Sequence, residues 1–443
     1  MIIDFSISNF RSIREMQTLS FEATNDKHLE EYFVIKVGKY RLLKIATILG
    51  ANASGKSNVL KAFYMLRELL LEPCQNKESS IDYDKFALDE ECLQRPSVMK
   101  VNFIVGESKY MYEVEFDNRV VYHELLKCQP FDASREHLVY ERSTNKESLV
   151  ASIKWGERYR SVKNTGILSG NLLHNRTLFG AYQNSNVDIP WIKKILDWIR
   201  SYFMPMITVS REQGLMQYVS RSVLKGEIGK QDLLRQIIKA DVGINNIDIE
   251  EKREPLDTDL VNAILQLCDD KAPAELKQKI RTDPTSTIVD VRMSHTGYQK
   301  AVPFDYSQES GGTQRYYELS GPLLELIGGS HFLAIDELEC RLHPDLYEHF
   351  VLTYIKNAKR SQIAITTHMR EFLRDKDTFR DDAVWITEKS DKGDTNLYSL
   401  ADFDTDSLRK ENSRYNFYKA GRFGGIPHLG DTYVQISNVS KDE

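Results

Sequence analysis

The sequence predicts an α/β fold built around a phosphate-binding loop, and three observations support this prediction. A short apolar run at residues 45–49 precedes a glycine-rich loop at 50–57, and an amphipathic helical pattern follows it. Later apolar runs at 331–335 and 363–367 each end in acidic residues or histidine. Residues 98–127 alternate between apolar and polar side chains, which is typical of an antiparallel meander. We therefore expect an α/β chain that contains a β-meander subdomain.

The glycine-rich loop matches the pattern G-x-x-x-x-G-K-[ST] without a mismatch. Gly50 and Gly55 let the backbone curl, so that its N–H groups point at phosphates, and the following helix adds its positive dipole end. Lys56 is expected to reach the β- and γ-phosphates, and the Ser57 hydroxyl to ligate Mg²⁺. A glycine-rich loop can also occur without binding a ligand. The strand and the helix that flank this loop favour the phosphate-binding interpretation. The residues predicted to bind ATP here are Gly50, Ala51, Asn52, Ala53, Ser54, Gly55, Lys56, Ser57 and Asn58.

Length and composition restrict the class of protein. The chain has 443 residues, enough for a large core and more than one lobe. Its formal net charge of −6 argues against a protein that coats nucleic acid through its overall charge. A local basic groove is compatible with this charge. The first residues predict a strand and no signal peptide, and no apolar run approaches the roughly 20 residues of a membrane span. Because its five cysteines are dispersed, we expect reduced thiols in a cytoplasmic protein.

The patterns divide the chain into three regions. Residues 1–185 carry the phosphate loop and the meander, and residues 286–443 carry the remaining candidate motifs. Between them, residues 186–285 show mainly helical spacing and are expected to form an inserted helical region. Its Trp191 and Trp198 fit a hydrophobic core better than a stacking platform. Its charged faces fit solvent, and they could also meet a partner.

Three signals in the last region complete the expected site. Ser310, Gly311 and Gly312 precede a helical pattern and can offer a hydroxyl and backbone N–H groups to a phosphate. After the strand at 331–335, Asp336 is placed to hold Mg²⁺ together with Ser57, and Glu337 to orient or deprotonate the attacking water. His368 ends the next strand and can hydrogen-bond the γ-phosphate. Each signal alone also fits a surface strand end, a capping turn or a loop. Their joint order after a complete phosphate loop predicts ATP hydrolysis, with Lys56, Glu337 and His368 as the catalytic residues.

At these residues the chain resembles the ABC-type ATPase heads of the SMC, RecF and OLD group. Within that group it is similar to the stand-alone, AAA-annotated ATPases of bacterial abortive-infection and anti-phage systems, such as AbiLi, RloA and the PARIS ATPase. The resemblance is carried by IIDFSISNFRSI, the loop at 50–57, YEVEFDNRVVYHELL, LLRQIIKADVGINNIDIE, ESGGTQRYYEL, FLAIDELECRLHPDL, TTH and YKAGRFGGIP. ABC heads typically carry Leu-Ser-Gly-Gly-Gln as a signature. Here Glu309 replaces the leucine and Thr313 precedes Gln314.

The resemblance implies the P-loop NTPase fold of an ABC head and a mechanism that uses two copies of the chain. Residues 310–312 of one protomer would complete the ATP site of the other, so a homodimer or higher oligomer is expected to form on ATP. Leu342-His343-Pro344 lies in the region that crosses the dimer interface in such heads. The subgroup implies an ATP- and Mg²⁺-dependent ATPase that gates a separately encoded effector in anti-phage defence.

Two other functions stay open at this point. An OLD-like nuclease would need a further domain, and few residues follow His368, although Asp404 and Asp406 have D-x-D spacing. A RecF-like repair ATPase would grip DNA through a basic surface, but the same side chains also fit a solvated helix face. The basic candidates are Lys356, Lys359, Arg360, Arg370, Arg374, Lys376 and Arg380.

Overall fold

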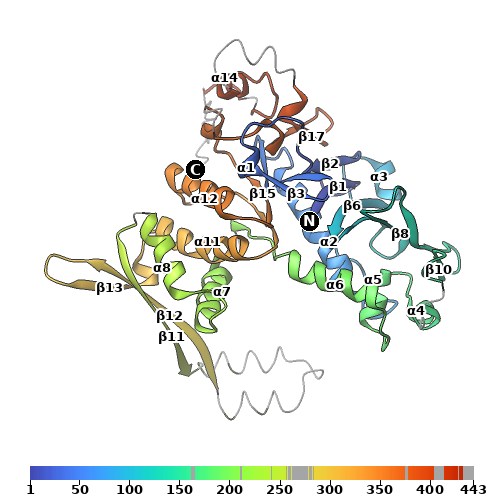
Figure 1. Ribbon diagram of the computed structural model, residues 1–443, viewed down its shortest axis with the longest axis horizontal. Coiled ribbons are helices and arrows are strands. Elements are labelled where there is room, and N and C mark those ends of the chain that lie inside the picture. Colours follow the sequence, from blue (N-terminus) through green and yellow to red (C-terminus); the bar gives the residue numbers. More distant parts are fainter. Residues whose placement is uncertain are drawn as a thin grey trace, which may run out of the picture. The chain divides into compact units, whose positions relative to one another are not determined.

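The computed structural model describes residues 1–160, 165–209, 212–240, 242–255, 257, 261, 278, 282, 284–374, 378–403, 414–427 and 429–432. The chain divides into two compact units (Figure 1). Unit 1 comprises Met1–Arg200 and Ala364–Glu443, and unit 2 comprises Ser201–Ile363. The boundaries predicted after residues 185 and 285 do not coincide with this division, and the three-region organisation stays a prediction.

The larger sheet of unit 1 is the predicted meander, extended by the first strands of the chain. Its strand order is β10-β9-β8-β7-β6-β1-β2, and each strand runs antiparallel to its neighbours. Along β6, Met99, Val101 and Phe103 are buried and the residues between them are half-buried, so the alternating pattern does give a strand. The strands are β1 (Ile2–Ser8), β2 (Gln17–Ser20), β6 (Ser97–Val105), β7 (Ser108–Phe116), β8 (Val121–Pro130), β9 (His137–Thr144) and β10 (Ala151–Trp155).

The helix after the phosphate loop packs against this sheet. Helix α2 (Lys56–Leu71) buries Val59, Phe63, Leu66 and Leu70, the residues that the helical spacing places on one face. The ring of Phe63 lies 4.2 Å from that of Phe5 on β1, measured between centroids. The other elements of the first 202 residues are α1 (Glu30–Phe33), β3 (Val34–Val37), β4 (Tyr40–Leu43), α3 (Glu90–Gln94), α4 (Thr165–Asn171), α5 (Leu178–Gln183) and α6 (Pro190–Tyr202).

A second sheet of unit 1 carries the phosphate loop. Strand β5 (Ile45–Gly50) lies between β15 (Gln362–Thr366) and β16 (Val384–Lys389), and β17 (Thr395–Ser399) follows at the edge. Strands β5 and β16 run parallel, with Thr387 beside Gly50. All six residues of β5 are buried, as in parallel strands that are covered on both faces. Short elements complete the unit: η3 (Glu371–Arg374), η4 (Asp381–Ala383), η5 (Leu400–Asp402) and α14 (Arg414–Lys419).

Unit 2 is built around helix α11 (Gly311–Gly328), which contacts α7 (Glu212–Leu224), α8 (Lys230–Lys239) and α12 (Pro344–Asn357). The predicted helix with Leu319 and Leu323 is therefore confirmed, and both side chains are buried. Strand β14 (Phe332–Ile335) is fully buried. Among the residues that the structure describes, no helix has the length and apolar character needed to cross a membrane.

A three-stranded sheet projects from unit 2 as a long ribbon (Figure 1). It consists of β11 (Ile244–Pro255), β12 (Thr285–Thr296) and β13 (Ala301–Asp305), in that order, and η2 (Tyr306–Gln308) follows. The prediction that residues 186–285 are mainly helical is wrong for 244–255. There Ile247 and Ile249 pair across the ladder with Met293 and Val291, so a distant strand supplies their apolar neighbours. Leu260, Ile264 and Leu265, whose spacing in the sequence is also helical, lie outside the described residues.

Candidate functional site

The phosphate loop links β5 to α2, and its glycines are required by close contacts. A Cβ atom at Gly55 would collide with Thr395 Oγ1 and lie 2.8 Å from Ser12 Oγ, and the backbone there has φ of 104°. A Cβ atom at Gly50 would lie 2.5 Å from Ser54 Oγ. Glycine alone tolerates both the backbone conformation and the crowding. The two glycines of the motif thus keep the loop closely folded.

Lys56 is held inside the loop. Its side chain is buried, and Nζ donates to the carbonyl oxygens of Gly50 and Ala51, at 3.0 Å each. A buried ammonium needs such partners because desolvation is costly. A phosphate-loop lysine that releases such carbonyls can meet the β- and γ-phosphates of a nucleotide. The loop therefore fits a nucleoside triphosphate.

A chain of side-chain hydrogen bonds supports the loop from other elements of unit 1. Ser54 Oγ bonds Thr387 Oγ1 on β16 at 2.6 Å, and Thr395 Oγ1 on β17 donates to Ser54 O at 2.9 Å. Ser12 Oγ bonds Thr395 Oγ1 at 2.8 Å and accepts from Asn58 Nδ2 at 2.7 Å. The Asn58 amide is thus used for this support, and its contact with ATP stays a prediction. Sequence reasoning missed Ser12, Thr387 and Thr395, because no motif spacing links them to the loop.

A cavity of about 790 Å³ opens against the first half of the loop. It has four walls: the loop itself, the segment after β15, the end of β16 and the closing segment of the described chain. His368 shares this cavity with the phosphate loop. The cavity lining includes Gly50, Ala51, His368, Arg370, Glu371, Glu388, Lys389, Tyr418, Gly425, Ile426 and Pro427.

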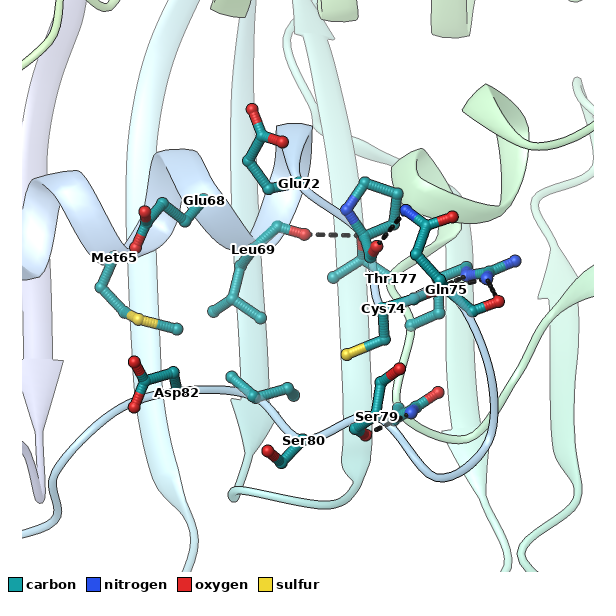
Figure 2. A pocket seen from close by; sticks show the side chains of 14 residues that line it. Met65, Glu68, Leu69, Glu72, Cys74, Gln75, Ser79, Ser80, Asp82 and Thr177 are labelled. Carbon is teal, nitrogen blue, oxygen red and sulfur yellow. Dashed lines mark hydrogen bonds between the residues drawn. The ribbon is translucent and has the colours of Figure 1, made fainter. Parts of the chain in front are cut away.

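A second cavity of unit 1 has a more acidic lining (Figure 2). Its volume is about 350 Å³, and it lies at the C-terminal end of α2, about 20 Å along the helix from Lys56 at 1.5 Å per residue. In Figure 2, Met65 and Leu69 of α2 point toward the segment that carries Ser80 and Asp82. Three carboxylates, those of Glu68, Glu72 and Asp82, belong to its lining with Arg176, whose guanidinium is bonded to backbone carbonyls. This lining suits a phosphate less well than the phosphate loop does.

The acidic pair follows β14 in unit 2. Asp336 N donates to Ile207 O at 2.9 Å, and Cys340 N donates to Glu337 O at 2.9 Å. Glu337 is exposed, and its backbone has φ of 49°. A left-handed conformation costs a non-glycine residue about 1–2 kcal/mol. Such strained residues gather at functional sites, which agrees with the catalytic role predicted for Glu337.

Ser310 caps helix α11, and its two glycines open the helix. Ser310 Oγ accepts from Thr313 N at 3.1 Å. A Cβ atom at Gly311 would lie 3.4 Å from Arg341 Cδ, and one at Gly312 would lie 3.0 Å from Arg341 O. A larger residue at 312 would push this turn away from the segment after Glu337. The turn and that segment are therefore closely packed within unit 2.

The structure explains two departures from the signature of ABC heads. Glu309, at the place of the leucine, is almost fully buried and lies 2.8 Å from His295 Nε2 on β12, measured from Oε1. The imidazole nitrogen of His295 is a polar partner for this buried carboxylate, so a glutamate is tolerated at this position. Gln314 Nε2 donates to Tyr306 O at 2.8 Å, so this side chain is bonded within its own unit.

The basic surface proposed as a DNA-binding alternative is corrected at one residue. Arg380 is 1% exposed and donates to the Asp382 carboxylate, at 2.9 Å from Nε and 2.6 Å from Nη2. It pairs inside unit 1 and is not a surface cation. The guanidinium carbons of Arg374 and Arg370 lie 4.4 and 5.7 Å from the centre of the Tyr415 ring. Lys376, Asp404 and Asp406 lie outside the described residues.

The predicted site residues therefore fall in two groups. The phosphate loop and His368 line one cavity of unit 1, whereas Asp336, Glu337 and residues 310–312 belong to unit 2. Their convergence on one nucleotide stays a prediction.

A buried strand, a complete phosphate loop and a helix define this chain as an α/β protein of the P-loop NTPase class. The chain belongs to the family described as "AAA domain, putative AbiEii toxin, Type IV TA system", which matches residues 45–165 and 219–374. The matched ranges include the phosphate loop, residues 310–312, Asp336, Glu337 and His368. They confirm an AAA-type ATPase family, and the finer assignment to anti-phage ATPases stays a prediction.

Several solved structures are similar to most of the chain at low identity. A SmcHead bound to the C-winged helix domain of ScpA is 12% identical with a TM-score of 0.42, covering 92% of this chain and 99% of that chain. The SMC head domain from Thermotoga maritima is 10% identical with a TM-score of 0.37, covering 90% and 98%. An Smc head with an extended coiled coil, bound to the C-terminal domain of ScpA derived from Pyrococcus furiosus, is 12% identical with a TM-score of 0.36, covering 92% and 98%. No curated protein matches. These are distant likenesses, and the fold class is carried by the strand order and phosphate loop of this chain.

Proposed function

We propose that this protein binds and hydrolyses ATP, dimerises when ATP is bound, and uses this cycle to control an effector protein. The observation that carries the proposal is the phosphate loop with its buried Lys56 beside a cavity that also holds His368. Lys56 would leave the carbonyls of Gly50 and Ala51 to meet the phosphates. The N–H groups of the loop and the start of α2 would hold the same phosphates.

The remaining residues divide the work of hydrolysis. Ser57 and Asp336 would hold Mg²⁺, which would neutralise charge that develops on the phosphates. Glu337 would orient the attacking water and accept its proton. His368 would donate a hydrogen bond to the γ-phosphate and so distinguish the states before and after cleavage.

The dimer is proposed because residues 310–312 open an 18-residue helix with a capping serine and two small residues. Such a helix start suits a phosphate, and, as the resemblance to ABC heads implies, the matching phosphate would be bound to a second copy. ATP would then join two copies and hydrolysis would separate them, which is a two-state switch.

Replacing Glu337 with glutamine tests hydrolysis and dimerisation together. We expect kcat to fall by roughly 10²–10⁴-fold, because the water loses its base, while ATP stays bound. The trapped protein should run as a dimer by light scattering in ATP and as a monomer without it. The Lys56→Ala protein is the control that should stay monomeric. A Glu337→Gln protein that binds ATP and remains monomeric at roughly micromolar concentration contradicts the ATP-driven dimer.

A mixing experiment tests whether Ser310 acts on the other copy. Ser310→Arg and Lys56→Ala proteins should each be inactive alone. In a mixed dimer, one of the two sites combines the intact Lys56 of one copy with the intact Ser310 of the other. We therefore expect an equal mixture to regain activity, to about a quarter of the wild-type value where the mixed dimers make up half of all dimers. No recovery in mixtures that form dimers contradicts action in trans.

The control of an effector is supported by the family, whose description refers to a toxin and to a type IV toxin–antitoxin system. We propose that the effector is encoded separately and acts in anti-phage defence. Coexpression with the product of the neighbouring gene should give a complex whose stability differs between ATP and ADP. If the Lys56→Ala protein formed the complex with the same stability as the wild type, partner binding would not depend on the ATP cycle. This result would contradict gating.

A further inference from the structure

One wall of the nucleotide cavity comes from a segment that the proposed ATPase mechanism does not use. Residues 420–427, here named the glycine wall, follow α14 and contain Gly421, Gly424 and Gly425. These three glycines have φ of 75°, 66° and 66°, a region that favours glycine. The wall belongs to the stretch YKAGRFGGIP, which carries part of the resemblance to anti-phage ATPases. This stretch has no role in the proposed mechanism of hydrolysis.

The glycine wall approaches the phosphate loop directly. A Cβ atom at Gly425 would lie 2.6 Å from Ile386 Cγ2 and 3.6 Å from the Cα of Gly50. Tyr418 Oη donates to Gly425 O at 3.0 Å, and Tyr398 Oη donates to Phe423 O at 2.8 Å. These two bonds anchor the wall from α14 and from β17. A side chain at 425 would therefore clash with Ile386 and displace the wall from β16, beside the loop.

The position of Lys56 shows which end of a nucleotide this wall would face. Its ammonium is bonded to Gly50 O and Ala51 O, within the loop where a phosphate-loop lysine meets the β- and γ-phosphates. Gly50 and Ala51 also line the cavity, together with Ile426 and Pro427 of the wall. The wall would therefore lie near the terminal phosphate of a bound nucleotide.

The cavity lining offers two cations to an additional phosphate. Arg370 and Lys389 line it from the segment after β15 and from the end of β16. Two carboxylates, those of Glu371 and Glu388, belong to the same lining, and Glu388 Oε2 accepts from Tyr398 Oη at 3.3 Å. Lys389 is exposed at the cavity rim, where a long side chain can reach an incoming anion.

We propose that the glycine wall, together with Lys389 and Arg370, forms the pocket for the terminal phosphate and makes this protein prefer ATP to ADP. The inference deepens the proposed function and rests on it only in requiring that the phosphate loop binds a nucleotide. It does not depend on dimerisation or on an effector.

The test compares the affinities of full-length variants for ATP and ADP by calorimetry. For Gly425→Ala we expect the affinity for ATP to fall by roughly tenfold or more, and the affinity for ADP to change by less than about twofold. Gly430→Ala is the matched control, because no atom lies within 4 Å of a Cβ at that position. It should bind both nucleotides as the wild type does. An equal loss for ATP and ADP, or no loss for either, overturns the inference.

Lys389→Ala decides the matter if Gly425→Ala does not fold. Because Lys389 is exposed, its removal should leave the unfolding midpoint in place, and we expect a roughly three- to tenfold loss for ATP alone. Equal affinities of Lys389→Ala and wild type for ATP overturn the inference. Failure of the proposed function would give a different result. In that case the Lys56→Ala protein would bind ATP as tightly as the wild type does, whatever the affinities of the glycine-wall variants.

Discussion

The two ends of helix α2 carry cavities of different chemistry. At the N-terminal end, the larger cavity is lined by the phosphate loop, and its charged side chains are balanced: Arg370 and Lys389 against Glu371 and Glu388. At the C-terminal end, the lining of the smaller cavity includes Glu68, Glu72 and Asp82 against Arg176 (Figure 2). The arrangement at the first end follows the polarity of a helix, whose N-terminus attracts anions. The phosphate loop and the polarity of the helix therefore identify the nucleotide site.

The two ends are also stabilised in different ways. Hydroxyl groups of Thr387, Thr395 and Ser12 support the loop at the N-terminal end. At the C-terminal end, Thr177 Oγ1 donates to Leu69 O at 3.1 Å and Gln183 Nε2 donates to Leu70 O at 2.9 Å. These donors satisfy carbonyls that the end of a helix leaves unpaired. One end is thus built to accept a ligand, and the other is closed by its own chain.

The largest effect is expected at the ligand end. Lys56→Ala removes the ammonium that meets the phosphates, and we expect the affinity for ATP to fall by about 100-fold or more. Calorimetry with ATP measures this. Lys61→Ala, on the same helix beyond the loop, should bind ATP normally. If the Lys56→Ala protein bound ATP with wild-type affinity, the N-terminal end of α2 would not be the ligand-binding end.

The next effect is a loss of stability at the closed end. Arg176 is buried and donates from Nε to Cys74 O at 2.9 Å and from Nη2 to Gln75 O at 3.0 Å. Arg176→Ala should lower the free energy of unfolding by about 2 kcal/mol, because two carbonyls lose charged donors. Urea denaturation measures the change, and the affinity for ATP should stay within about twofold. Arg235→Ala, whose side chain is 69% exposed, is the control.

A smaller effect is expected where the loop is supported. Thr387→Val keeps the shape of a fully buried residue and removes the hydroxyl that bonds Ser54 Oγ at 2.6 Å. We expect the free energy of unfolding to fall by about 1 kcal/mol and the affinity for ATP to fall a few-fold. Thr387→Ser should restore both values. Unchanged stability would show that water replaces the lost hydroxyl.

The smallest effect is expected from the acidic cavity. Glu72→Gln removes a charge from its lining, about 20 Å along α2 from Lys56, where solvent and salt screen it. The affinity for ATP, measured by the same calorimetry, should stay within about twofold of the wild type. A clear change would show that the two ends communicate through the helix.

Sequence reasoning predicted the elements whose signals are local. The strand, loop and helix at 45–70, the meander and helix α11 each carry their own period or motif, and the structure confirms them. Strand β11 was missed because its isoleucines gain their neighbours from β12, after a long intervening segment. Arg380 was placed on a surface because charge alone does not reveal a buried pair with Asp382.

The candidate site shows the same limit. The phosphate-loop residues follow from a motif, because backbone geometry restricts them to glycine, lysine and serine at fixed spacing. The glycine wall could not be placed beside Gly50, because its glycines indicate turns and do not indicate what those turns approach. Asp382, two residues after Arg380, was the one local signal that could have identified the buried pair.

The walls of the nucleotide cavity also bear on how the protein is made. Gly50 and Gly425 lie close together at the cavity, although several hundred residues separate them in the sequence. During synthesis the ribosome releases the phosphate loop well before the glycine wall. The growing chain therefore cannot complete this side of the cavity until residues 420–427 have been translated, so chains that stop before them would be poor ATP binders.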